Sequence, residues 1–187
     1  YTEGDHKEFD AHVTKEHLRV THQYYQNCYN HDRSVRNLAR QTLTNRVKTK
    51  DGHKCTTHGS RMSGDVDTSL GNCLINQAIL QSCLHRLRIR GEIIVNGDDF
   101  IIFSKTPVPN QEMTQMLTEY NMETIMKDSV TDIHQVEFCR LKVVLTAEGE
   151  HTMMIDPMRV IKVIGITSSH IPSYFRYCME VIFACSK

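Results

Sequence analysis

The spacing of apolar residues predicts two helices in the first half of the chain. Thr14 is a suitable N-cap, and residues at helical spacing follow it, so we expect a helix over about residues 15 to 30. A longer, mostly apolar set of residues at helical spacing follows Ser63-Gly64 and ends at Gly91. Its members are Leu70, Cys73, Leu74, Gln77, Leu80, Leu84 and Leu87. This second helix should be long and buried.

Short runs of β-branched and aromatic residues predict strands farther along. Residues 92–96 and 100–104 flank Gly97-Asp98-Asp99, a pattern that indicates a β-hairpin with acidic residues at its tip. A helix should follow Pro109, because apolar residues recur there at helical spacing. Further strands are expected near residues 122–126, 136–145 and 151–155, with a turn at Glu148-Gly149.

Two other segments differ in composition. Residues 40–55 are polar and rich in threonine around Asp51-Gly52, a dipeptide suited to a tight turn, so we expect an exposed β-hairpin. From Pro157 onward the pattern becomes apolar and helical, with a break at Pro172. We therefore place a subdomain boundary near residue 150. The order of elements predicts an α+β fold in which an antiparallel sheet is backed by helices.

Composition narrows the class of protein without deciding it. A chain of 187 residues, 40% of them hydrophobic, can bury the core of one domain and part of a second. Its 22 basic and 22 acidic residues cancel, whereas nucleic-acid-binding proteins often carry a basic excess. A nucleic-acid-binding protein can still be neutral in one part of its chain, where carboxylates at a centre offset basic residues along its channels.

Cysteine usage and the start of the chain bear on its setting. The seven cysteines include no C-x-x-C pair, which favours a reduced, cytosolic environment. No stretch approaches the ~20 apolar residues of a transmembrane helix, so we expect no membrane span within this segment. The chain opens on Tyr1 and enters a motif by Asp5, so we expect a piece of a longer protein.

Candidate chemistry lies in three motifs that follow one another. They are D-x4-D at Asp5 and Asp10, S-G-x3-T-x3-N at Ser63, Gly64, Thr68 and Asn72, and the acidic pair Asp98 and Asp99. Taken alone, Gly-Asp-Asp occurs by chance in roughly one chain in twenty of this length at average residue usage. Three constrained patterns in one order are far harder to reach by accident.

Close carboxylates suit nucleotidyl transfer. Joining a nucleotide to a growing strand is an in-line displacement at a phosphate, and two metal ions ~3.5–4 Å apart can clamp the attacking and leaving oxygens. Mg²⁺ prefers a few carboxylate oxygens as ligands. We expect Asp5 at the end of one strand, with Asp98 and Asp99 at a hairpin tip, to supply them.

The middle motif suits the reading of a sugar. Thr68 and Asn72 are four residues apart on the predicted helix, so they share a face near Ser63 and Gly64. They either contact one ligand together or cap the helix start. In a polymerase that ligand is the ribose of the incoming nucleotide, whose 2′-hydroxyl distinguishes RNA from DNA precursors. Asp10 is placed to join the same network.

These motifs resemble those of RNA-dependent RNA polymerases from the tombusvirus and carmovirus group of positive-strand RNA viruses. Residues 59–72, GSRMSGDVDTSLGN, closely resemble motif B, the most specific of the matches. The other matches are DHKEFDAHV at 5–13 to motif A, VNGDDFII at 95–102 to motif C, METIMK at 122–127 to motif D and VEFCRLKVV at 136–144 to motif E. The resemblance spans about residues 1 to 145.

The resemblance implies an architecture and a set of partners. Residues 1–150 would form a polymerase palm with a fingers hairpin inserted at about 38–60, and residues 151–187 the start of a truncated helical thumb. The partners would be an RNA template and primer strand, nucleoside triphosphates and the rest of the viral replicase chain. This part is expected to be inactive alone. Its location would be the host cytoplasm, at membrane-associated replication sites reached through other parts of the replicase.

The resemblance also implies roles for single residues. Asp5 and Asp98 would be the principal ligands of two Mg²⁺ or Mn²⁺ ions, with Asp99 a secondary one. Lys127 would give a proton to the departing pyrophosphate. The hairpin at 136–145 would grip the end of the primer strand. The residues implied to bind the nucleotide are Asp10, Ser63, Gly64, Thr68 and Asn72.

Two departures from the group and two alternative functions complete the picture. Phe100 follows the acidic pair where this group commonly has cysteine, and Lys7-Glu8 is unusual inside motif A. One alternative is a reverse transcriptase, which usually has an aromatic steric gate five positions after the first metal aspartate. This chain has Asp10 at that position, which favours ribonucleotides. The other alternative is a non-catalytic, palm-derived RNA-binding module. The presence of all three aspartates argues against it, because such a module would not need to hold several carboxylates together against their mutual repulsion.

Overall fold

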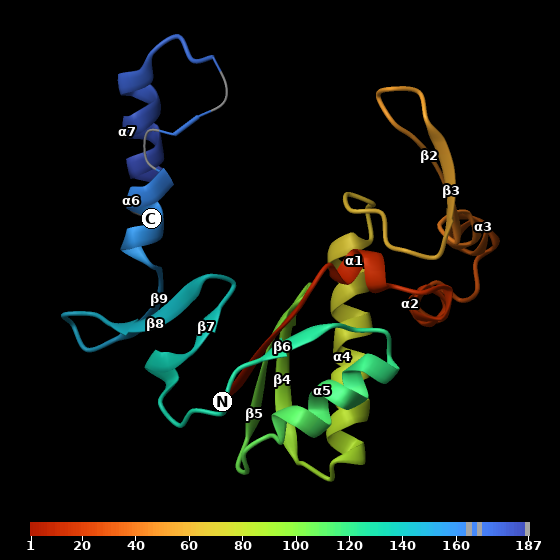
Figure 1. Ribbon diagram of the computed structural model, residues 1–187, viewed down its shortest axis with the longest axis horizontal. Coiled ribbons are helices and arrows are strands. Elements are labelled where there is room, and N and C mark those ends of the chain that lie inside the picture. The colour runs from red at the N-terminus through yellow and green to blue at the C-terminus, as the bar shows by residue number, and fades with distance from the viewer. Residues whose placement is uncertain (164–165, 168–169, 186–187) are drawn as a thin grey trace. The chain divides into compact units, whose positions relative to one another are not determined.

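The structure is a computed structural model that describes residues 1–163, 166–167 and 170–185, and it divides into two compact units (Figure 1). The first unit runs from Tyr1 to Thr131 and the second begins at Asp132. This division precedes the boundary expected near residue 150. The assignment of residues to palm, fingers and thumb therefore stays a prediction, whereas the mixed fold of helices and antiparallel sheets is confirmed.

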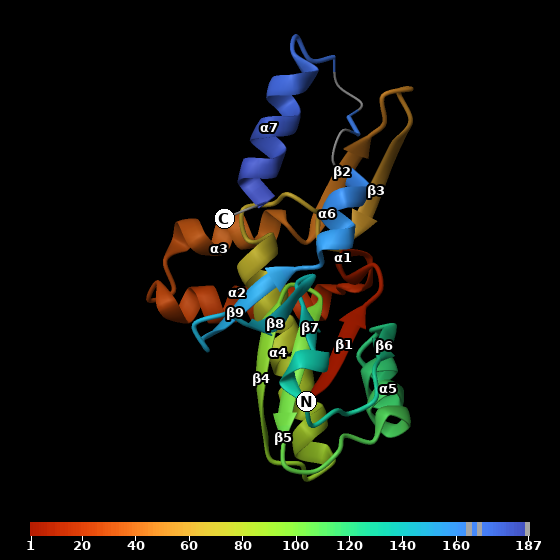
Figure 2. The same cartoon turned by 90° about the vertical axis from the view of Figure 1, so that its left-hand side faces the viewer.

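The first unit is built around a four-stranded antiparallel sheet. Figure 2 shows its strands in the order β4-β5-β1-β6. They are β1 Thr2–His6, β4 Gly91–Asn96, β5 Asp99–Ser104 and β6 Thr124–Met126. The predicted hairpin around Gly97-Asp98-Asp99 is confirmed as β4 and β5. Asp5 lies in β1, one residue before the strand ends.

The described residues of the first unit form five helices. They are α1 Phe9–His12, α2 Lys15–Cys28, α3 Arg33–Gln41, α4 Thr68–Arg86 and α5 Asn110–Glu119. Two of them, α2 and α3, begin at side-chain caps. The Thr14 hydroxyl accepts the amide hydrogen of His17, and the His17 ring accepts the Thr14 amide hydrogen. The predicted N-cap of α2 is thus confirmed. Helix α3 was not predicted; Asp32 caps it by accepting from the amides at 34 and 35.

One face of the sheet is covered by α4 and α5 (Figure 1). Leu80 and Leu84 of α4 are buried there with Leu117 of α5 and Ile102 of β5. The predicted long, buried helix is therefore confirmed as α4. His6 of β1 points into this core. Side chains alternate along a strand, so the preceding residue, Asp5, projects from the opposite face of the sheet, where it is exposed.

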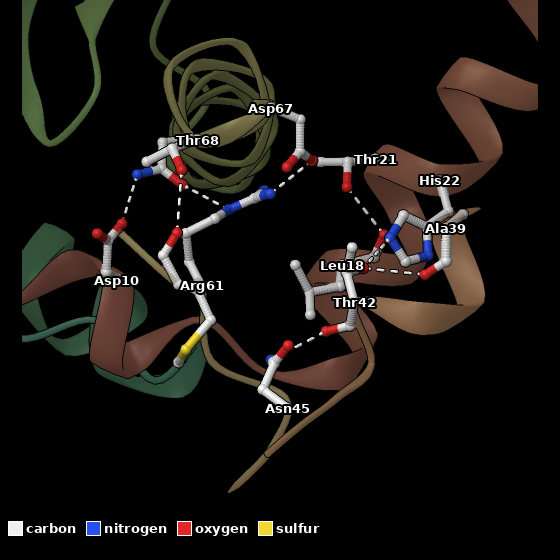
Figure 3. Close-up of polar contacts among 12 residues, drawn as sticks. Asp10, Leu18, Thr21, His22, Ala39, Thr42, Asn45, Arg61, Asp67 and Thr68 are labelled. Atoms are coloured by element: carbon white, nitrogen blue, oxygen red, sulfur yellow. Dashed lines mark hydrogen bonds and ion pairs between the residues drawn. The ribbon is translucent and has the colours of Figure 1, made fainter. Parts of the chain in front are cut away.

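A two-stranded ribbon projects beyond α3, away from the four-stranded sheet (Figure 1). It consists of β2 Thr44–Lys48 and β3 Lys54–His58, joined by a turn in which Gly52 has φ +87°. The exposed hairpin predicted around Asp51-Gly52 is thereby confirmed. At its base, His22 Nε2 of α2 lies 3.0 Å from the Thr42 hydroxyl (Figure 3).

The second unit holds a three-stranded antiparallel sheet, in the order β7-β8-β9, followed by helices. Its elements are a 3-10 helix Ile133–Gln135, β7 Glu137–Phe138, β8 Leu141–Leu145, β9 His151–Ile155, α6 Pro157–Val163 and α7 Tyr174–Cys185. The hairpin at 136–145 and the helical pattern interrupted near Pro172 are confirmed. The predicted thumb segment 151–187 includes residues 164–165, 168–169 and 186–187, which lie outside the described residues.

An ion pair joins α6 to the sheet of this unit. Arg159 Nη2 of α6 lies 2.8 Å from Glu137 Oε1 of β7. No helix in the described part of the chain combines the length and apolar character needed to cross a membrane.

Candidate active site

Strand register places acidic residues side by side. Asp5 of β1 lies directly opposite Asp99 of β5, and Asp99 lies directly opposite Asn96 of β4. Residues paired in this way project from the same face of a sheet. Asp98 sits in the two-residue turn beside them, where Gly97 has φ +65°. The structure thus brings the three predicted aspartates to the same end of the sheet.

The charges of these aspartates act on one another. Burial raises the pKa of the Asp5 carboxyl, and the negative charges of Asp98 and Asp99 raise it further, while Lys127 opposes them. Clustered carboxylates of this kind fit a divalent cation, because oxygen ligands suit Mg²⁺ and its charge relieves their repulsion. Among the described residues, however, no three His, Cys, Asp or Glu side chains are already arranged as a metal-binding group.

The acidic turn is fastened to α4 by partly buried hydrogen bonds. Asn76 Nδ2 donates to the Gly97 carbonyl oxygen at 2.9 Å, and the Gly97 amide donates to Cys73 Sγ at 3.3 Å. His6 Nε2 lies 3.0 Å from Asn76 Oδ1, and His6 Nδ1 lies 2.7 Å from Thr124 Oγ1. Burial lowers the pKa of His6, and a neutral ring with its proton on Nε2 satisfies both partners.

Sequence reasoning assigned no role to His6 or Asn76. Both are buried, with exposed fractions of 2% and 0%. A signal for Asn76 was present, because Thr68, Asn72 and Asn76 follow one another along α4 at intervals of four residues, so they share one face. The polar face of α4 therefore extends one turn beyond the predicted motif and supports the acidic turn.

Asp10 is held by two donors from the middle motif. Asn72 Nδ2 donates to Asp10 Oδ1 at 2.7 Å, and the Ser63 hydroxyl donates to Asp10 Oδ2. The amide of Arg61 also donates to the Asp10 carbonyl oxygen at 2.9 Å. The structure thus brings Asp10, Ser63 and Asn72 together, as the sequence predicts, although they lie far apart along the chain.

Thr68 and Gly64 shape the loop that carries Ser63. The Thr68 hydroxyl donates to the Met62 carbonyl oxygen at 3.1 Å (Figure 3), so in this structure it secures the start of α4. Gly64 has φ +97°, a conformation that residues with a side chain rarely adopt. These two predicted residues therefore position the loop, and their contact with a nucleotide stays a prediction.

A buried arginine fixes the orientation of Asn72. The Arg61 side chain is 1% exposed; its Nη1 lies 2.5 Å from Asp67 Oδ2, and its Nε donates to Asn72 Oδ1 at 3.0 Å (Figure 3). Because Arg61 can only donate, it selects the amide oxygen, and the Asn72 nitrogen is left to face Asp10. Gly71 makes room, since a Cβ there would lie 2.3 Å from Arg61 Nη2.

Arg61 was also missed from the sequence. It lies within the run that resembles motif B, but an arginine in a loop is usually solvated, and nothing in its spacing indicates burial. The pairing with Asp67 and the absence of a side chain at Gly71 became visible only in the structure.

A hollow of about 430 Å³ lies between the Asp10, Ser63 and Asn72 side chains and the acidic turn. It is lined by Glu8, Phe9, Asp10, Ala11, Ser63, Asn72 and Asp98. Four predicted site residues thus share its wall. The remaining predicted residues, which lie outside this lining, are Asp5, Gly64, Thr68, Asp99 and Lys127.

Lys127 forms an ion pair with Glu3 of β1. Its Nζ lies 2.5 Å from Glu3 Oε2, and its amide donates to the Glu3 carbonyl oxygen at 3.0 Å. The lysine side chain is 61% exposed and that of Glu3 only 9%. Lys127 is therefore held beside β1, close enough for its charge to act on Asp5, and its role as a proton donor stays a prediction.

Comparison with known proteins covers nearly the whole chain. Residues 4–186 match the family described as viral RNA dependent RNA polymerase. The chain belongs to this polymerase family. Its membership confirms the resemblance inferred from the five motifs.

Individual viral polymerases are similar over most of this chain. It is 31% identical, over 97% of its length, to the RNA-directed RNA polymerase of maize chlorotic mottle virus (isolate United States/Kansas/1987). It is 31% identical over 88% of its length to that of tobacco necrosis virus (strain A), and 29% identical over 82% to that of melon necrotic spot virus. The chain spans about a fifth of the length of these polymerases, 20%, 23% and 20% in turn.

The structure explains how this polymerase chain accommodates Phe100 after the acidic pair. Phe100 is buried and lies opposite Gly4 in the β1–β5 register. A Cβ on Gly4 would come within 2.1 Å of the Phe100 ring. Gly4 therefore provides the space for this aromatic side chain, directly before Asp5.

Proposed function

We propose that this chain is the catalytic palm of a viral RNA-directed RNA polymerase, which joins ribonucleotides on an RNA template. The observation that carries the proposal is the placement of three aspartates at the end of β1 and β5, beside a hollow lined by Asp10, Ser63 and Asn72. Family membership supports it. Neither a reverse transcriptase nor a non-catalytic RNA-binding module is favoured by that membership.

Asp5 and Asp98 would hold two Mg²⁺ or Mn²⁺ ions, with Asp99 as a secondary ligand. When bound, such ions stabilise negative charge on the oxygens of the reacting phosphate. The chain's own contribution is to keep the turn in place through Asn76 and to hold the Lys127 ammonium on Glu3, close enough for its charge to act on Asp5. Lys127 would then release its ion pair with Glu3 to protonate the leaving group.

Asp10 would read the ribose. Each of its carboxylate oxygens accepts one hydrogen bond, from Asn72 or from Ser63, and each has a further lone pair. A 2′-hydroxyl in the hollow can therefore donate to Asp10 without displacing either residue. A deoxyribose has no such donor, so the preference for ribonucleotides follows from this arrangement.

The proposal is tested by primer extension with the full-length protein. Given a primed RNA template and ribonucleoside triphosphates, the protein should lengthen the primer in the presence of Mg²⁺ or Mn²⁺, and a chelator should stop the reaction. The lengths of the products are measured on a denaturing gel. Extension that continues in excess chelator, or that requires a DNA template, would contradict the proposal.

Asn72→Ala is expected to reduce the preference for ribonucleotides over deoxyribonucleotides by about tenfold, because hydrogen bonds to charged groups contribute roughly 1.5–3 kcal/mol. The substitution leaves Asp10 Oδ1 without its donor and free to reorient. The measurement is the ratio of kcat/KM for a matched pair of triphosphates. Ser69→Ala, an exposed change on the same helix, is the control; an unchanged ratio in Asn72→Ala removes this residue from sugar selection.

A further inference from the structure

We propose that the β2–β3 hairpin binds a single strand of RNA through its phosphates, on a surface outside the candidate active site. The inference rests on the proposed function, in which RNA strands are the template and product. It adds a specific contact surface to that function.

Positive charge is concentrated in and beside this hairpin. Residues 33–58 contain seven of the 22 lysines and arginines but one of the 22 acidic residues, in a chain with no net charge. The seven are Arg33, Arg36, Arg40, Arg46, Lys48, Lys50 and Lys54. All are exposed, and within the described residues none forms an ion pair. Their charges are therefore available to a ligand.

Strand register gathers three of these cations on one face of the ribbon. Lys48 lies directly opposite Lys54, and Arg46 lies two residues before Lys48 on the same strand, so all three project from the same face. We call Arg46, Lys48 and Lys54 the basic face. The other face carries Val47 and Thr57, both of which are partly buried.

The basic face is unfavourable in the absence of an anion. Like charges directly opposite each other destabilise an antiparallel pair, and Lys48 and Lys54 are such a pair. Asp51 at the turn is the only acidic residue of the hairpin. A strand of phosphates laid along this face would neutralise the repulsion that the hairpin otherwise carries.

The charge continues onto the helix that leads into the hairpin. Arg33, Arg36 and Arg40 recur along α3 at spacings of three and four residues, so they lie on one side of it. Figure 1 shows α3 at the base of the ribbon. Arg36 and Arg40 also line a hollow of about 390 Å³ against α2, whose wall includes Arg19. A strand leaving the hairpin would thus meet further cations.

Side-chain chemistry favours RNA over an anionic membrane. Binding to a lipid surface needs apolar or aromatic side chains that enter the bilayer, and Val47 is the only large aliphatic residue between Thr44 and His58, a segment without Phe, Tyr or Trp. Phosphate recognition needs cations and hydroxyl donors. The same segment supplies both, since its threonines are Thr44, Thr49, Thr56 and Thr57.

The test measures how salt weakens the binding of single-stranded RNA to the full-length protein. Affinity falls with salt by a slope of about 0.7 for each phosphate neutralised on a single strand, so removing three contacts should lower the slope by about 2. The variant Arg46→Gln, Lys48→Gln, Lys54→Gln is compared with Arg88→Gln, Arg90→Gln, Lys105→Gln, which removes the same charge from exposed positions near the other end of the sheet. Fluorescence anisotropy with a labelled oligonucleotide gives the affinities.

The expected result is a reduced slope in the hairpin variant alone. A charge-preserving variant, Arg46→Lys, Lys48→Arg, Lys54→Arg, should keep the wild-type slope, which attributes the effect to the positive charge and not to the particular side chains. An unchanged slope in the hairpin variant, or an equal reduction in the control, overturns the proposal. So does a hairpin variant that binds RNA normally but no longer binds phosphatidylcholine vesicles containing phosphatidylserine, since a membrane would then be the ligand.

The failure of this inference and that of the proposed function are separable. Asp98→Asn retains the hairpin and should bind RNA with the wild-type slope. If the hairpin variant binds like the wild type while Asp98→Asn still abolishes synthesis, the hairpin surface is wrong and the catalytic assignment stands.

Discussion

Asp98→Asn is expected to reduce RNA synthesis by the full-length protein on the order of a hundred- to a thousandfold, the usual effect of removing one strong electrostatic contact from a reacting centre. Asp98 lies in the turn and lines the hollow, and asparagine preserves its shape while removing its charge. The rate of primer extension with Mg²⁺ or Mn²⁺ is the measurement. The free energy of unfolding should be unchanged, because the turn is held through backbone groups of Gly97.

A matched control removes the same charge elsewhere. Glu112→Gln lies at an exposed position of α5, outside every surface proposed to bind RNA or nucleotide, and should retain wild-type synthesis. If Asp98→Asn keeps more than about a tenth of the wild-type rate, a loss of under ~1.4 kcal/mol, Asp98 is not a principal ligand and the catalytic assignment is wrong.

Arg61→Met is expected to lower the free energy of unfolding by roughly 3 kcal/mol, since removing one partner of a buried ion pair leaves the other charge uncompensated. Methionine fills similar space, so the loss reports the contacts to Asp67 and Asn72 rather than a large cavity. Denaturant unfolding monitored by circular dichroism measures it. Discrimination between ribonucleotides and deoxyribonucleotides should fall as well, because Asn72 loses the donor that sets its amide.

Two further variants separate charge from geometry at Arg61. Arg61→Lys keeps the charge, but an ammonium cannot reproduce the fork that reaches Asp67 and Asn72 together, so part of the loss should remain. Gly71→Ala should disturb the same guanidinium from the other side. A double-mutant cycle with Asp67→Asn gives the coupling directly. A stability change below about 0.5 kcal/mol in Arg61→Met, the range of ordinary surface substitutions, would show that the pair is dispensable.

The elements with strong periodicity could be predicted from the sequence. Helix α4 repeats its apolar residues over many turns, and the strands β4 and β5 flank a two-residue turn, so local pattern and fold agree. Helix α3 was missed because its residues are mostly polar and only Ala39 is buried. The Asp32 cap was its available signal, and a polar cap before a polar helix resembles any loop.

The sequence could propose the candidate site residues, which the structure brings together, whereas it did not indicate the residues that hold them in place. Aspartates in motifs can be recognised locally, but the burial of a polar side chain depends on partners distant in sequence. Asn76 is buried against His6, 70 positions away, and His6 against Thr124, 118 positions away. Neither pairing can be deduced from spacing, because only the folded sheet brings these strands beneath the turn.

Helix α4 connects two parts of the site that the chain otherwise keeps separate. Asn72 bonds the carboxylate of Asp10, and Asn76, one turn later, bonds the turn that carries Asp98. At a rise of 1.5 Å per residue, these two asparagines are about 6 Å apart along the axis. The length of a helix is fixed by its backbone hydrogen bonds, so a ribose bound at Asp10 would have its phosphate at a constant distance from the candidate metal ligands. The same helix would then set both the position of the sugar and that of the reacting phosphate.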